Sequence, residues 1–152
     1  MKNFRFIILV LFVLVAGHGC TKDLPLFDMS YVAFDYNSSS STSIDCQGIV
    51  DAQYYIHLTS QRLTTNLEVA VDVIPGSGME EGVDYELITT GNVIFRPDIY
   101  DMPFRIRWLN HEIDKNDENT VTLRLSSSNM ENVELGMPGP DELRRTIVIR
   151  KY

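Results

Sequence analysis

The sequence predicts an all-β fold of about seven to eight strands, in which two antiparallel sheets pack face to face. Apolar and polar residues alternate with a period of two in many short stretches, as they do in half-buried strands. Turn signals rich in Gly, Pro, Asn and Ser separate these stretches. No segment after about residue 30 has the period of an amphipathic helix. Short strands with one apolar face each are typical of a β-sandwich.

The predicted strands follow one another at regular intervals. They cover residues 31–36, 49–59, 67–73, 85–88, 92–95, 102–109, 120–126 and 144–152. The alternation places Trp108 on the inward face of its strand, with Arg105 and Arg107 outward, where they can pair with acids of a neighbouring strand. Residues 37–43 are expected to form a polar loop without a residue to bury, and residues 127–143 a long loop with two glycines and two prolines.

The first twenty residues have the layout of an export signal. Lys2 and Arg5 precede an unbroken apolar run of residues 6–16, which is too short to span a bilayer. Gly17, His18 and Gly19 follow, and then Cys20. We therefore divide the chain into a signal peptide (1–19), a tether (20–30) and a sandwich domain (31–152).

A cysteine directly after such a run resembles a lipobox, although Gly17 stands where that motif prefers Leu and His18 is unusual there. The resemblance implies a diacylglyceryl group on the Cys20 thiol and cleavage before this residue. The protein would then be anchored by this lipid in a bacterial outer membrane, facing the periplasm or the cell surface. Ordinary cleavage after Gly19 and an uncleaved anchor are the alternatives. Lipidation leaves Cys46 as a lone thiol, whereas an unlipidated Cys20 could form a disulfide with it.

The charge balance restricts the partners. The net charge is −8, and removal of Lys2 and Arg5 would make the chain more acidic. An acidic surface repels phosphate backbones, so nucleic acid is not expected as a partner. It also disfavours electrostatic docking on anionic lipid, so membrane attachment is expected to come from the lipid on Cys20.

The order of motifs after about residue 31 resembles a Calx-beta domain, which is an immunoglobulin-like sandwich. The resemblance is carried by residues 81–85 (EGVDY), by 93–97 (VIFRP) followed by 104–107 (FRIR), by the acidic segment 112–118 before 120–125, and by the ending 146–149. It implies a binding module. Similar sandwiches also occur in bacterial outer-membrane lipoproteins linked to glycan use.

Some Calx-beta domains bind Ca²⁺ through carboxylates at one end of the sandwich, and this ion requires six to eight oxygen ligands. The residues that could contribute here are Asp84, Glu112, Asp114, Asp117 and Glu118. The binding members end in a run of aspartates after the last strand, whereas this chain ends Ile149-Arg150-Lys151-Tyr152. We therefore expect no cofactor, with Ca²⁺ as the alternative.

Motifs of catalysis are absent from the sequence. It has no Gly-x-Ser-x-Gly, no P-loop and no paired metal-binding histidines, and neither His57 nor His111 has a partner at a recognisable spacing. We therefore expect a binding, adhesion or scaffolding module and no enzyme. Tyr55, Tyr100 and Tyr152 are candidates for exposed rings that could stack on a sugar, which leaves a glycan-binding accessory protein and a Ca²⁺-dependent module as alternatives.

Overall fold

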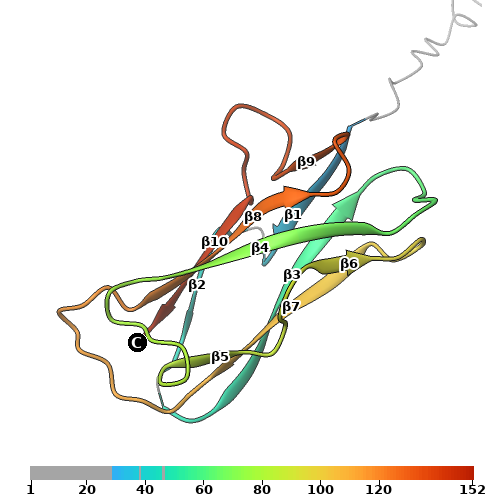
Figure 1. The fold of residues 1–152 in the computed structure, drawn as a ribbon. Helices are drawn as coiled ribbons and strands as arrows, with labels where there is room; N and C mark the ends of the chain where they lie inside the picture. The colour runs from blue at the N-terminus through green and yellow to red at the C-terminus, as the bar shows by residue number, and fades with distance from the viewer. Residues whose placement is uncertain (1–28, 38, 46) are drawn as a thin grey trace, which may run out of the picture.

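The computed structural model describes residues 29–37, 39–45 and 47–152, which contain ten strands and no helix. The strands form two five-stranded sheets (Figure 1). Their bounds are β1 Ser30–Asp35, β2 Ser41–Ile44, β3 Val50–Thr59, β4 Leu67–Pro75, β5 Tyr85–Leu87, β6 Val93–Phe95, β7 Asp101–Trp108, β8 Thr120–Ser128, β9 Val133–Leu135 and β10 Thr146–Lys151. Since no helix occurs in these ranges, none there is long and apolar enough to cross a membrane.

The first sheet has the strand order β5-β7-β3-β1-β9 and the second β2-β10-β8-β4-β6. Most neighbouring strands are antiparallel, and the longest ladder joins β3 and β7, where Val50 pairs with Trp108 and His57 with Asp101. Two pairs are parallel, namely β1 with β9 and β10 with β2. The prediction of an all-β sandwich is confirmed, and the two parallel pairs at the sheet edges are an addition to the antiparallel scheme.

The core lies between the sheets and contains the inward residues that the alternation predicted. Trp108 is fully buried, and its indole Nε1–H donates a hydrogen bond to the Tyr54 hydroxyl at 3.1 Å. The Trp108 ring also packs against Tyr85, with ring centroids 6.1 Å apart. Other members come from both sheets; among them are Val32, Phe34, Ile56, Leu67, Phe95, Phe104, Leu123, Leu125, Ile147 and Ile149.

Two strands lie where the sequence predicted loops. Residues 41–44 form β2, which pairs with β10, and Ile44 packs against the core. Residues 133–135 form β9, which pairs with β1, and Val133 is buried. The prediction of unstructured polar segments was therefore wrong at these positions. Both strands are short and lie at sheet edges, so their pairing comes from tertiary contact and leaves little alternation in the sequence.

The two ends of the sandwich differ in what they carry. β1 begins at one end, and the C-terminal residue lies at the opposite end (Figure 1). At this second end, which we call the C-terminal end, lie the loop of residues 76–84 and the loop of residues 109–119 (Figure 1). β1 begins at Ser30, and the predicted signal peptide, most of the predicted tether, Cys20 and Cys46 lie outside the described residues.

Candidate functional site

Backbone hydrogen bonds hold the loops of the C-terminal end against each other. The Gly76 amide donates to the Thr120 carbonyl at 2.7 Å, and the Gly78 amide donates to the Glu118 carbonyl at 3.2 Å. A Cβ atom on Gly76 would overlap the backbone carbonyl oxygen of Glu118, so only glycine permits this approach. The Lys151 amide donates to the Asn119 carbonyl at 2.9 Å and ties the end of β10 to the same loop.

A buried ion pair lies beneath these loops. The Lys151 side chain is fully buried, and its ammonium donates a hydrogen bond to Asp84 Oδ1 at 2.9 Å. Only 4% of the Asp84 side chain is exposed. His111 Nδ1 lies 3.0 Å from the same oxygen, and Asp84 Oδ2 accepts a hydrogen bond from the Glu80 amide at 3.0 Å. Asp84 therefore joins the end of β10, the turn before β5 and the loop after β7.

The surroundings of Asp84 keep its carboxylate ionised. Burial raises the pKa of Asp84, but the bonds from the Lys151 ammonium, the Glu80 amide and His111 together outweigh burial and hold this pKa below its ordinary value. A buried carboxylate with this many donors is satisfied and gains nothing from a further cation.

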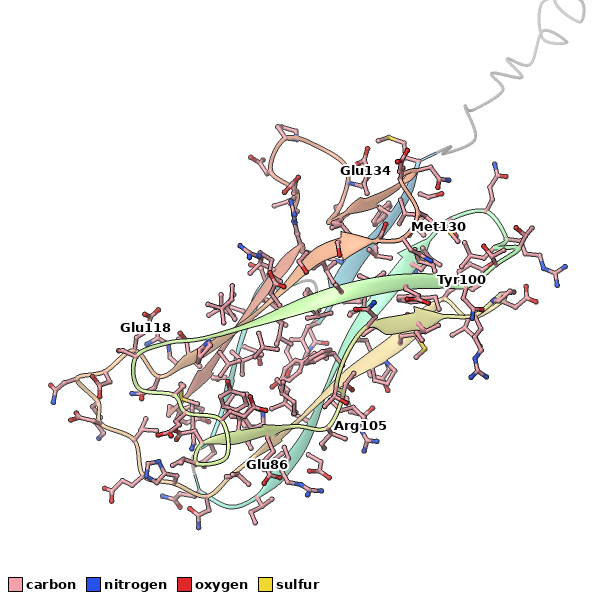
Figure 2. All side chains as sticks on the ribbon, in the orientation of Figure 1. Glu86, Tyr100, Arg105, Glu118, Met130 and Glu134 are labelled. Carbon is pink, nitrogen blue, oxygen red and sulfur yellow. The ribbon has the colours of Figure 1, made fainter. Side chains whose placement is uncertain are left out.

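The five carboxylates that were candidates for the alternative of Ca²⁺ binding do not converge. Asp84 is buried and bonded to Lys151, while the other four lie on the exposed loop 109–119. Asp114 accepts hydrogen bonds from the amide and the side chain of Asn116. Glu118 lies on this loop at the C-terminal end (Figure 2), and Thr120 donates to its carboxylate at 3.4 Å.

The donor set at this end does not fit Ca²⁺. No group of three or more His, Cys, Asp or Glu residues that could hold a metal ion occurs within 29–152, leaving out 38 and 46. Ca²⁺ requires several carboxylate oxygens around one point. Here one buried carboxylate is present, and an ammonium group already occupies it.

A hollow of about 500 Å³ opens beside the buried pair. It is lined by Asp45, Gln47, Asn110, Glu112, Ile113, Lys115 and Tyr152. Tyr152 follows Lys151 in the chain, and Asn110 and Glu112 flank His111, so the buried ion pair fixes the backbone on two sides of the hollow. Within the described part of the chain, no side-chain hydrogen bond or ion pair engages Asn110, Glu112 or Tyr152.

The three candidate tyrosines lie in different places. Tyr152 is 61% exposed and lines the hollow at the C-terminal end. Tyr55 is 44% exposed on β3, and its hydroxyl donates to Gln53. Tyr100 lies in the other half of the molecule (Figure 2), partly buried against the core. Tyr100 is thus less exposed than the other two, because the Leu58 amide donates to its carbonyl at 2.8 Å and holds this turn against the sandwich.

His57 and Arg107 each pair with an acid of a neighbouring strand. His57 Nδ1 lies 2.7 Å from Asp101 Oδ1 across the β3–β7 ladder, at an exposed position. Neither His57 nor His111 contacts a hydroxyl or thiol nucleophile in the hydrogen bonds of the described residues. Arg107 pairs with Asp51 of β3 at 2.7 Å, which confirms the predicted cross-strand pairing for this residue.

Solved structures of other proteins share this fold. No protein-family model and no curated protein matches the sequence. The structure is similar to the crystal structure of CBD12 from CALX1.2, with a TM-score of 0.57 and 17% identity over 80% of this chain and 43% of that chain. It is also similar to a two-domain protein of unknown function from Bacteroides fragilis NCTC 9343, with a TM-score of 0.53 and 8% identity over 81% of this chain and 45% of that chain.

The chain thus spans less than half the length of these two structures. At such low identity the similarity concerns the fold, which agrees with the motifs in residues 81–149. The described residues form an all-β sandwich with a Calx-beta-like fold.

Proposed function

We propose that this protein is an exported lipoprotein, attached to the bacterial outer membrane through Cys20, whose sandwich is a non-catalytic binding or scaffolding module. The observation that carries the proposal is the placement of the two ends. β1 begins at the end opposite to the loops of the C-terminal end (Figure 1). A tether before β1 would therefore leave the hollow that Tyr152 lines, which we call the Tyr152 hollow, directed away from the membrane.

The exported and lipidated state is tested by intact mass and by partitioning into detergent after expression in a Gram-negative host. We expect the wild type to carry a lipid mass and to enter the detergent phase. Cys20→Ala is expected to lose both properties, whereas the matched variant Cys46→Ala keeps them. A wild type that lacks the lipid mass and stays in the aqueous phase would remove the membrane-bound part of the proposal.

The Tyr152 hollow favours a saccharide as a second candidate function. Its wall combines an exposed aromatic ring with carboxylates, amides and one ammonium group, all from side chains of the described residues. Aromatic faces pack against the apolar side of a sugar ring, and carboxylates and amides bond its hydroxyls. The carboxylates of Asp45 and Glu112 disfavour a phosphorylated ligand.

Affinity electrophoresis in gels that contain a soluble neutral glucan or xylan tests this candidate. We expect at least one polymer to retard the wild type and Tyr152→Ala to migrate faster in it. Tyr55→Ala is the matched control, because this ring is exposed on β3 and does not line the hollow. Retardation that is the same in Tyr152→Ala, or no retardation by either polymer, would contradict the saccharide candidate and leave a protein partner.

A further inference from the structure

The position of Lys151 is unusual for a lysine. This side chain belongs to the last strand and is fully buried, although lysine is almost never buried without a partner. Its partner Asp84 lies 67 residues earlier in the chain. Lys151 Nζ also lies 3.5 Å from the backbone carbonyl oxygen of Asp84, so the ammonium group contacts this carbonyl as well as Oδ1 of the carboxylate.

The ammonium group lies where three segments meet. Asp84 belongs to the turn before β5, where its own amide donates to the Glu80 carbonyl at 2.8 Å. Its carbonyl accepts the Leu109 amide at 2.9 Å, which brings in the end of β7. Lys151 adds β10, and its amide reaches the Asn119 carbonyl. One positive charge therefore balances the buried carboxylate on which these segments converge.

We propose that the Lys151 ammonium group takes the place of a bound metal cation at the C-terminal end of the sandwich. It neutralises the buried Asp84 carboxylate and stabilises this end, so that the domain folds to full stability without Ca²⁺. A metal ion at this end would need a vacant cluster of carboxylates. In the described residues the single buried carboxylate is already neutralised, and the acids of loop 109–119 are exposed and separate. The inference goes beyond the proposed function, because its test measures folding and not export or ligand binding.

The first experiment compares thermal unfolding of the purified wild-type protein in millimolar CaCl₂ and in EDTA at neutral pH. A ligand that binds only the folded state raises the melting temperature with its concentration. We expect the two melting temperatures to agree within error. A melting temperature that rises with CaCl₂ concentration, and that MgCl₂ at the same ionic strength does not raise, would overturn the inference.

The second experiment replaces the ammonium group. Lys151→Met retains much of the side-chain volume and removes the charge, so Asp84 is left buried without its counter-ion. We expect the melting temperature to fall by about 10 °C or more, in CaCl₂ and in EDTA alike. Arg150→Met is the matched control on the same strand, since Arg150 is exposed, and is expected to melt like the wild type.

Each outcome of the second experiment shows whether the Lys151 ammonium group stabilises the domain. Failure of Lys151→Met to fold while Arg150→Met folds would support the role of the ammonium group. A Lys151→Met protein that melts at the wild-type temperature would overturn it, because the buried carboxylate would then need no cation. The comparison on the wild type does not depend on the folding of either variant.

Discussion

Replacement of Tyr54 by phenylalanine isolates one hydrogen bond of the core. The Tyr54 hydroxyl accepts the indole N–H of Trp108 at 3.1 Å, and both side chains are buried. The substitution keeps the ring and removes only the hydroxyl group, so the Trp108 N–H loses its acceptor. A buried donor without a partner costs about 1–3 kcal/mol. For a domain of this size, at about 3–5 °C per kcal/mol, that is a fall in melting temperature of about 3–15 °C.

Urea unfolding followed by tryptophan fluorescence measures this effect directly. Trp108 is the only tryptophan of the sequence and lies in the core, so its emission reports exposure of the core to water. Tyr55→Phe is the matched control, because the Tyr55 hydroxyl is exposed and bonds only Gln53 in the described contacts. We expect the control to change the free energy of unfolding by less than about 0.5 kcal/mol. Equal midpoints for the two variants would refute the reasoning.

Three further predictions concern pH and packing. Burial raises the pKa of Tyr54 to about 12, although the hydrogen bond from Trp108 lowers it. The unfolded chain therefore loses this proton at a lower pH than the folded protein, and we expect the urea midpoint to fall as the pH rises from about 10 through 12. Leu123→Ala should cost about 2–5 kcal/mol because Leu123 is fully buried, whereas Leu143→Ala, at an exposed position, should cost under about 0.5 kcal/mol in the same assay. The lowered pKa of Asp84 contributes stability that is present above its unfolded pKa near 4 and is lost as the pH falls through its folded value. Asp84→Asn should therefore be less stable at neutral pH and lose this part of the acid dependence; an unchanged acid limb in Asp84→Asn would contradict the assignment.

The strands with one apolar face could be predicted from the sequence because burial on one side imposes a period of two. The pattern of β7 placed Phe104, Ile106 and Trp108 inward, and all three are buried. The pattern could not find β2, whose residues Ser41–Ile44 are polar except for the last. This strand forms because β10 offers it a parallel partner, and such pairing depends on the whole fold.

The candidate site could be predicted only in part, because its contacts join segments that are far apart in the sequence. The alternation of Ile147 and Ile149 continues to Lys151, and this period of two is the signal that could have placed the lysine on the inward face. The burial of Lys151 was not predicted, since nothing in the sequence connects it with Asp84. The acidic segment 112–118 was visible as charge, and its separation from Asp84 became clear only in the structure.

A double-mutant cycle between Lys151 and Asp84 tests most directly whether their buried ion pair stabilises the C-terminal end of the sandwich. The free energy of unfolding is measured for the wild type, Lys151→Met, Asp84→Asn and the double variant. Loss of one member leaves the other buried without the opposite charge of the pair, at a cost of about 3–5 kcal/mol, whereas loss of both removes this penalty. We predict a coupling free energy of about 2 kcal/mol or more, with a double variant more stable than Lys151→Met. Effects that add within about 0.5 kcal/mol would show that the two side chains act independently and would contradict the account.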